Sequence, residues 1–310
     1  MPDPLPTWGT ASVAAVRRFA RVRLLALDVD GTLLEGGGHS VFGHIRTLAN
    51  STLLRPIHFV IATGRTLYGV APILRQWPVT MNNPAILYNG SVVTTPRDNQ
   101  VIYSRTISKP AVSAILDVCR IHHRPVLAYI CRPQRILGSD SLEEVYGWTH
   151  SWRPETEFNG LSVNWQSNWR YVASTAPTAV LVKTPEQRDG ALARDLRSLE
   201  GIEVTTSGGA FAEIRPHGSN KAAALDFVVS KLGLDRGCVL AMGDNDNDAD
   251  MLRWAGIGVA VASASKHASA NANYVCRHGV AGGVVEILRL IRSARRYYRD
   301  ELGHTTPEVQ

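Results

Sequence analysis

Two aspartates separated by one residue follow a short apolar run near the start of the chain. Residues 22–27 form this run, and Asp28-Val29-Asp30-Gly31-Thr32 follows it, as expected for a buried strand that enters a tight loop. Alternate residues of a strand project to the same side, so the two carboxylates would lie close together. Neighbouring carboxylates repel each other unless a cation or a shared proton offsets their charge. The pair therefore indicates either a site with a metal, a nucleophile and a proton-transfer group, or an ordinary solvated turn.

A second acidic segment, Gly243-Asp244-Asn245-Asp246-Asn247-Asp248, follows the apolar run at residues 239–242. Aspartates that alternate with asparagines also open a calcium-binding EF-hand loop, which needs glycine at its sixth position and an acidic residue at its twelfth. Ala249 and Ala255 stand at those positions, so the EF-hand interpretation fails. In a parallel sheet this loop would lie close to Asp28 and Asp30 and share a hard cation with them. Ligands that are all oxygen atoms suit Mg²⁺.

Three further residues are suited to holding a phosphate beside such a cation. Thr63 and Gly64 follow the apolar run at residues 57–62. Thr63 offers a hydroxyl, and Gly64 lets its backbone N–H approach a phosphate closely. Lys221, near the start of a predicted helix, supplies a compact positive charge. Its alternative role is that of a solvated helix lysine.

Strands that alternate with helices predict a parallel sheet whose carboxyl-terminal edge carries these residues. The chain shows this alternation twice, on either side of a stretch in which the regular alternation of strands and helices is lost. The predicted elements are strands at 22–27, 57–62, 85–88, 211–215, 239–242 and 258–262, with helices near 41–53 and 66–76, from about 219, and at about 281–299. We therefore expect an α/β fold with a discontinuous core at residues 22–90 and 213–300.

The stretch at residues 91–212 predicts an inserted α/β domain. Its predicted elements are strands at 126–130, 178–183 and 202–206, and helices at 108–122 and 186–199, the first capped by Ser108 and the second entered through Pro185. Residues 131–170 are predicted to be irregular. Their four tryptophans are expected to pack the middle of this domain, with a ligand-stacking platform as the alternative, and they are Trp148, Trp152, Trp165 and Trp169. Residues 1–21 are expected to be an N-terminal extension with a surface helix.

The composition is that of a globular chain. Of the 310 residues, 45% are hydrophobic and 19% are charged. The net charge of +6 suits anionic substrates, but Lys and Arg are spread along the chain, so we expect no nucleic-acid partner. No run approaches the roughly 18 apolar residues of a membrane span, so we expect no membrane association. No feature predicts the oligomeric state.

The four cysteines are widely spaced, which favours a reducing compartment and hence the cytoplasm. Two of them stand near histidines, and this group contains residue types that bind zinc: Cys119, His122, His123 and Cys131. A helix end followed by a strand accounts for these residues as well. We therefore expect no zinc site here.

The polar segments together resemble the four ordered motifs of the haloacid dehalogenase superfamily of phosphatases. In chain order these motifs are Asp28-Val29-Asp30-Gly31-Thr32, Thr63-Gly64-Arg65, Lys221 and Gly243-Asp244-x-x-Asn247-Asp248-x-x-Met251. The large insert, with Asn89-Gly90 before it and Gly279-Val280-Ala281 near the end, resembles the Cof-type subfamily. The resemblance covers about residues 22–295. It implies a Rossmann-like parallel-sheet core and an inserted α/β cap domain at 91–212.

This resemblance implies a magnesium-dependent phosphomonoester hydrolase that acts on a small phosphorylated metabolite, such as a sugar phosphate. Asp28 would attack the phosphorus and form an aspartyl-phosphate. Asp30 would protonate the leaving group and then activate water. Mg²⁺ would bind Asp28, the backbone carbonyl of Asp30 and Asp244, with Asp248 close by. The phosphate-binding residues implied by the motifs are Thr63, Gly64, Lys221 and Asn247.

Two alternative functions stay open. A hexose phosphomutase uses the same core chemistry but needs a sugar-bisphosphate activator. A catalytically inactive regulatory or binding protein would have lost Asp28, Asp30 or Lys221, and all three are present. The chain departs from the family pattern at Ser263-Ala264, where most relatives carry Asn-Ala. The motifs imply no role for Asp246 or Asp250.

Overall fold

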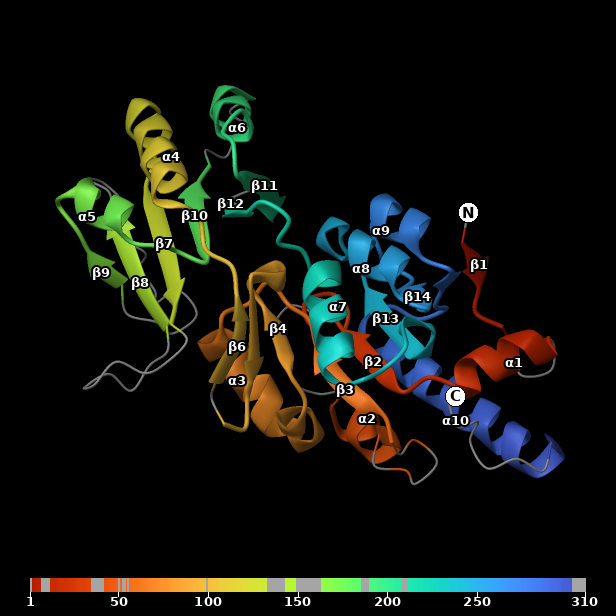
Figure 1. The fold of residues 1–310 in the computed structure, drawn as a ribbon. Coiled ribbons are helices and arrows are strands. Elements are labelled where there is room, and N and C mark those ends of the chain that lie inside the picture. The colour runs from red at the N-terminus through yellow and green to blue at the C-terminus, as the bar shows by residue number, and fades with distance from the viewer. Residues whose placement is uncertain are drawn as a thin grey trace. The chain divides into compact units, whose positions relative to one another are not determined.

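The computed structural model describes residues 2–6, 12–34, 42–49, 51, 54, 56–98, 100–132, 143–148, 163–184, 190–207 and 211–302 (Figure 1). The chain divides into two compact units. The first unit comprises Met1–Thr63, Leu74–Ile86 and Asn220–Gln310, and the second comprises Gly64–Ile73 and Leu87–Ser219. The insert was expected at residues 91–212. The second unit extends beyond it to Leu87 and Ser219, and it also includes Gly64–Ile73, which were expected in the core.

A parallel sheet forms the centre of the first unit. In the described residues it has six strands in the order β1-β15-β14-β13-β2-β3. Every residue of β2, β13 and β14 is buried, which is typical of parallel strands that are covered on both faces. The strands of this sheet are β1 (Asp3–Pro4), β2 (Leu24–Leu27), β3 (His58–Ile61), β13 (Val239–Gly243), β14 (Ile257–Ala260) and β15 (Tyr274–Val275).

Helices of the first unit follow most of these strands, as the alternating pattern predicts. They are α1 (Val13–Ala20), α2 (Phe42–Ala49), α7 (Lys221–Lys231), α8 (Ala249–Trp254), α9 (Lys266–Asn271) and α10 (Val280–Leu302). Short 3-10 turns are η2 (Pro78–Asn82), η4 (Arg236–Cys238) and η5 (Asp246–Asp248), and α3 (Leu67–Gln76) belongs partly to each unit. The helices predicted near 41–53 and 66–76, from about 219 and at about 281–299 correspond to α2, α3, α7 and α10, whereas α8 and α9 were not predicted. Of the helix predicted at 186–199, residues 186–189 lie outside the described residues.

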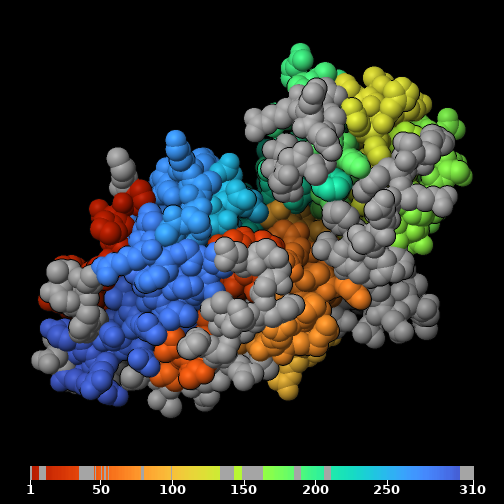
Figure 2. All heavy atoms as spheres, turned by 180° about the vertical axis from the view of Figure 1, so that it is seen from behind, coloured from red at the N-terminus to blue at the C-terminus, as the bar shows by residue number. Residues whose placement is uncertain are grey.

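The N-terminal segment is part of the first unit. Its strand β1 pairs in parallel with β15. Helix α1 packs against α10 (Figure 1), and in Figure 2 the red N-terminal residues lie on the same side as the blue C-terminal ones. Ser12 caps α1 by accepting a hydrogen bond from the N–H of Ala15. The buried guanidinium of Arg295 on α10 donates to the carbonyls of Ala20 at 3.3 Å and Val22 at 2.5 Å. Arg295 thus ties the end of α1 to the start of β2.

Replacing Arg295 by methionine is expected to lower the free energy of unfolding by about 1–3 kcal/mol, because two buried carbonyls lose their donor while the aliphatic stem stays packed. Denaturant unfolding measures this change. Arg292→Met is the matched control, because Arg292 is exposed on the same helix. Equal losses in the two variants would contradict the bridging role of Arg295.

A second sheet, largely antiparallel, forms the centre of the second unit. In the part of the chain that the structure describes, it has six strands in the order β11-β12-β10-β7-β8-β9. They are β7 (Val126–Cys131), β8 (Glu143–Trp148), β9 (Val163–Trp165), β10 (Ala179–Lys183), β11 (Ile202–Ser207) and β12 (Phe211–Pro216). The helices of this unit are α4 (Lys109–Ile121), capped by Ser108 as predicted, α5 (Trp169–Ser174) and α6 (Gly190–Arg197). Also among the described residues, a three-stranded sheet joins β4 (Ala85–Leu87), β5 (Val92–Thr95) and β6 (Gln100–Ser104), with the turn η3 (Tyr88–Gly90) between β4 and β5.

The expectation of an α/β fold with a parallel-sheet core and a further mixed domain is confirmed, but three local predictions were wrong. The strand predicted at 211–215 is β12, which pairs antiparallel with β10 and β11 instead of joining the parallel sheet. The strand predicted at 85–88 is β4, which belongs to a separate three-stranded sheet instead of the parallel sheet, although a parallel bridge joins Ile86 to Ala62. Residues 131–170, predicted to be irregular, contain β8 and β9.

Strand β8 escaped prediction because it begins with an acidic residue that is buried. The carboxylate of Glu143 accepts hydrogen bonds from the N–H groups of Leu67 and Tyr68 at 2.6 and 2.8 Å. It also accepts one from the hydroxyl of Tyr88 at 2.6 Å. These three donors compensate the burial of the carboxylate, which its residue type alone does not predict.

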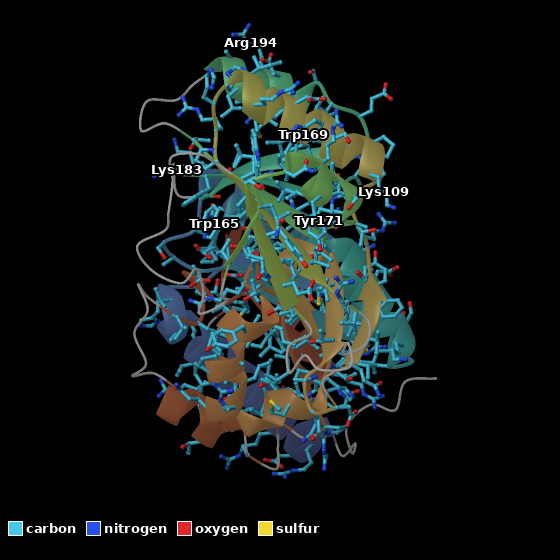
Figure 3. The ribbon with its side chains drawn as sticks, turned by 90° about the vertical axis from the view of Figure 1, so that its left-hand side faces the viewer. Lys109, Trp165, Trp169, Tyr171, Lys183 and Arg194 are labelled. Carbon is cyan, nitrogen blue, oxygen red and sulfur yellow. The ribbon has the colours of Figure 1, made fainter. Side chains whose placement is uncertain are left out.

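The tryptophans of this stretch divide between core and surface. Trp148 belongs to the apolar core of the second unit, and Trp169 packs against that core beneath the guanidinium of Arg120. Trp165, labelled in Figure 3 with Trp169, is 39% exposed. Trp152 lies outside the described residues. The packing prediction is therefore right for Trp148 and Trp169 and wrong for Trp165.

Among the helices that the structure describes, none is both long enough and apolar enough to span a membrane.

Candidate active site

The predicted site residues of the first unit come together at the carboxyl ends of three neighbouring parallel strands. Strand β2 lies between β3 and β13, with Leu27 in register with both Ile61 and Met242. The chain leaves β2 at Asp28, whose N–H donates to the carbonyl of Met242 at 3.0 Å. Asp244 follows the end of β13 in the same way. The sheet thus places the first and fourth motifs side by side.

Three carboxylates gather at this edge. Oxygen atoms of Asp28, Asp244 and Asp248 lie within 4.8 Å of one another, and among the described residues this is the one cluster of metal-ligating side chains. Asp28 and Asp248 are buried, and Asp244 is partly buried. The possible zinc ligands Cys119, His122, His123 and Cys131, all of them described, form no such cluster. His122 instead pairs with Asp195 at 2.7 Å.

The ammonium of Lys221 joins two of these carboxylates. Its Nζ lies 2.6 Å from Oδ1 of Asp28 and 2.6 Å from Oδ1 of Asp248, and the side chain is completely buried. Lys221 is the first residue of α7, which Asn220 caps by accepting a hydrogen bond from Ala223 at 2.8 Å. The cap and the helix therefore aim Lys221 at the end of the sheet. The alternative of a solvated helix lysine is wrong.

Asp248 organises the loop that carries Asp244. Its Oδ2 accepts hydrogen bonds from the N–H groups of Asp244 and Asn245 at 3.0 and 3.1 Å. Asn245 in turn accepts one from the N–H of Asp246 at 2.9 Å. Since its other oxygen accepts from Lys221, Asp248 connects the backbone of the loop to the buried ammonium.

Gly31 and Thr32 fit the loop of the first motif against Asp244. Gly31 has φ +87°, and a Cβ at this residue would lie 2.2 Å from Oδ2 of Asp244, so only glycine fits. The buried hydroxyl of Thr32 donates to Oδ1 of Asp244 at 3.2 Å. Sequence reasoning gave Thr32 no separate role, although its position in the first motif was a usable signal.

The charges at this site are unbalanced. Burial raises the pKa of Asp28 well above its usual range, the charge of Asp248 raises it further, and the ammonium of Lys221 partly offsets both. Burial, followed by the charge of Asp248, also raises the pKa of Asp244. Burial by itself lowers the pKa of Lys221, but Asp248 and Asp28 outweigh it, so its pKa is raised and the amine stays protonated.

The remaining predicted residues are not part of the three-carboxylate cluster. Asp30 is exposed, and Thr63 is buried with its N–H donating to the carbonyl of Ile86 at 2.9 Å. Asn247 is partly buried in η5. Gly64 belongs to the second unit, where a Cβ at this residue would lie 2.9 Å from the side-chain nitrogen of Asn89.

The donor set fits a divalent cation. All three side-chain ligands are carboxylates, which suit hard cations such as Mg²⁺. Three carboxylates and one ammonium leave two negative charges uncompensated if all are ionised, and a divalent cation carries the matching charge. The structure therefore contains an acidic cluster of the kind that holds a metal ion.

Comparison with known proteins agrees with this geometry. A model of the haloacid dehalogenase-like hydrolase family matches residues 25–288. The curated 5-amino-6-(5-phospho-D-ribitylamino)uracil phosphatase YcsE of Bacillus subtilis is 25% identical over 273 residues, which are 88% of this chain and 97% of that protein.

Solved structures show the same fold at lower identity. A haloacid dehalogenase-like hydrolase from Bacteroides thetaiotaomicron has a TM-score of 0.70 at 21% identity, covering 87% of this chain and 99% of that one. The subclass IIB sugar phosphatase BT4131 has a TM-score of 0.66 at 20% identity, covering 89% and 99%. Because the family model spans most of the sequence, this chain belongs to the haloacid dehalogenase-like hydrolase family, and the prediction of an enzyme of this phosphatase superfamily is confirmed.

Proposed function

We propose that this protein is a magnesium-dependent phosphomonoester hydrolase that acts on a small phosphorylated metabolite through an aspartyl-phosphate on Asp28. The observation that carries the proposal is the buried contact of Lys221 with Asp28 and Asp248, beside Asp244 at the end of the parallel sheet. A buried ammonium between carboxylates is costly to fold unless the surrounding geometry is well matched. The buried ammonium of Lys221 therefore supports a catalytic role for this group of charged residues.

Asp28 is the proposed nucleophile. One of its oxygens accepts a hydrogen bond from Lys221, which holds the carboxylate in a fixed orientation at the end of β2. Attack of a carboxylate oxygen on phosphorus forms the acyl phosphate and releases the alcohol of the substrate. Lys221 has three donors, of which Asp28 and Asp248 take two, so a third can contact a phosphoryl oxygen.

Asp30 is the proposed acid and base, two residues along the same loop. Its side chain is exposed, unlike that of Asp28, so it can reach a leaving group and then a water molecule. It would donate a proton to the departing alkoxide and take one from the attacking water. Thr63, Gly64 and Asn247 stay proposed phosphate contacts.

The proposed metal ligands are the carboxylates of Asp28 and Asp244 and the carbonyl of Asp30, with Asp248 close by. A divalent cation bound there would offset the excess negative charge, favour ionised Asp28 and polarise a phosphoryl oxygen. The chain's own contribution is the fixed geometry of the loops that carry these ligands.

The proposed substrate class is supported by the family and by the relatives of this chain. YcsE is named for a phosphorylated ribitylamino compound and BT4131 for sugar phosphates, which are both small metabolites. We propose a substrate of the same kind for this chain. The four cysteines are buried and free, which supports a reducing, cytoplasmic location.

Phosphate release by the purified full chain tests this function. An aryl phosphate is expected to be hydrolysed in millimolar Mg²⁺ and not in excess chelator, with activity restored when Mg²⁺ is added back, because the acidic cluster needs a cation. A panel of phosphorylated metabolites then identifies the preferred substrate. Undiminished turnover in chelator would refute the metal-dependent mechanism. Interconversion of sugar monophosphates that needs a sugar bisphosphate and releases little phosphate would favour a phosphomutase.

A further inference from the structure

The loop after β14 is bonded to the loop that carries Asp244. The N–H of Ser265 donates to the carbonyl of Asp244 at 2.7 Å. The hydroxyl of Ser265 donates to Oδ1 of Asp246 at 2.6 Å. The same hydroxyl accepts a hydrogen bond from the N–H of Ala268, which is buried in α9, at 3.1 Å. Ser265 therefore connects the acidic loop to the start of α9.

Together with the bonds described above, the contact with Ser265 restrains both the backbone and the side chain of Asp244. Its N–H donates to Asp248, its carbonyl accepts from Ser265, and its carboxylate accepts from Thr32. The backbone of Asp244 is thus held on both sides, and its side chain is held by a third residue. The bond between Ser265 and Asp246 fixes the loop two residues further on.

Neither Ser265 nor Asp246 belongs to the carboxylate cluster that fits a cation. The cluster consists of Asp28, Asp244 and Asp248, and Asp246 is exposed outside it. Their contribution must therefore pass through the loop. Residues that orient metal ligands in this way typically change metal affinity by about 10–100-fold when they are removed.

We propose that Ser265 and Asp246 are positioning residues that hold Asp244 in the orientation required for binding the cation. This inference rests on the proposed function, because it concerns the same metal. It gives Asp246 a role that the sequence motifs do not supply. It also explains why the segment after β14 contributes to a site that lies at the end of β13.

A double-mutant cycle tests the proposal. The variants are Ser265→Ala, Asp246→Ala and the double variant, each compared with wild type for Mg²⁺ binding by calorimetry and for the Mg²⁺ dependence of aryl phosphate hydrolysis. Each single variant is expected to bind Mg²⁺ about 10-fold more weakly. The double variant is expected to be no weaker than the weaker single variant, because both changes break the same bond. At saturating Mg²⁺, kcat should stay within about twofold of wild type, since the reacting groups are unchanged.

Matched controls separate positioning from charge and from helix stability. Asp250→Ala removes an exposed carboxylate from the adjacent helix α8, and Ser269→Ala removes a hydroxyl from α9. Both are expected to bind Mg²⁺ like wild type. Ser265→Thr keeps a hydroxyl and a helix cap and should restore binding to within about threefold, because threonine can serve at the N-cap.

Three results would overturn the proposal: wild-type affinity in both single variants, losses that add in the double variant, or equal losses in the controls. Calorimetry also separates this proposal from the proposed function. If wild type binds Mg²⁺ but releases no phosphate from any substrate, the proposed function fails and the variants still decide the role of Ser265 and Asp246. If wild type binds no Mg²⁺, the positioning role is refuted.

Discussion

Replacing Asp28 by asparagine is expected to lower kcat for phosphate release by about 10⁴-fold or more, the scale on which loss of a nucleophile acts in other enzymes. Asparagine has nearly the same shape and can still accept a hydrogen bond from Lys221, but its neutral amide is too weak a nucleophile to form the acyl phosphate that water then hydrolyses. Steady-state kinetics with an aryl phosphate measures the change, and circular dichroism checks that the fold is kept.

The matched control for this change is Asp250→Asn. Asp250 is exposed on α8 and pairs with Arg253 at 3.2 Å, away from the carboxylate cluster. This variant is expected to keep wild-type kcat. Comparable activity in Asp28→Asn and wild type would exclude Asp28 as the nucleophile.

Replacing Lys221 by methionine is expected to reduce both stability and activity. Loss of the ammonium leaves Asp28 and Asp248 buried beside each other without a counter-charge, which costs about 3–5 kcal/mol when one partner of a buried pair is removed. The same change removes a donor to the transferring phosphoryl group, worth about 10²–10³-fold in kcat. Denaturant unfolding in chelator and steady-state kinetics in saturating Mg²⁺ measure the two effects separately.

Lys231→Met is the control on the same helix. Lys231 is exposed at the end of α7, so its replacement is expected to change the free energy of unfolding by no more than about 0.5 kcal/mol. If Lys221→Met had the same free energy of unfolding as this control and kept wild-type kcat, the buried contacts of Lys221 would contribute neither to stability nor to activity.

The candidate site could be predicted from the sequence largely because parallel strands place their carboxyl ends together. Asp28, Thr63 and Asp244 each follow an apolar run, so the expected sheet brings their backbones to one edge. The sequence around Lys221 does not distinguish a site residue from a solvated lysine, since most lysines on helices are solvated. The cap at Asn220 and the crowding of carboxylates decide its burial, and both depend on tertiary structure.

The parts that escaped prediction depend on buried polar contacts between distant segments. Glu143 is buried because backbone N–H groups of α3 and a tyrosine hydroxyl compensate its carboxylate. In β12, Glu213 accepts hydrogen bonds from the side chain of Asn89, and Arg215 donates to the carbonyls of Asn89 and Ser219. A strand with two such charged residues gives no sign in its own sequence of which sheet it joins.

The pairing of Ser265 with Asp246 belongs to the same class of contact. The two residues lie 19 positions apart and meet because β13 and β14 run in parallel, with Gly243 in register with Ala260. The sequence shows two polar loops after two strands but not which side chains face each other. The exact residue-by-residue pairing of the two strands has to be known before such a pair can be identified.

The most direct test of the central claim is to find where the phosphoryl group is carried during turnover. Wild-type protein is mixed with substrate and Mg²⁺, quenched in acid within one turnover and analysed by peptide mass spectrometry. A phosphoryl group on Asp28, absent from Asp28→Asn treated in the same way, is the predicted result. A phosphoryl group on another residue, or full turnover by Asp28→Asn, would contradict the account.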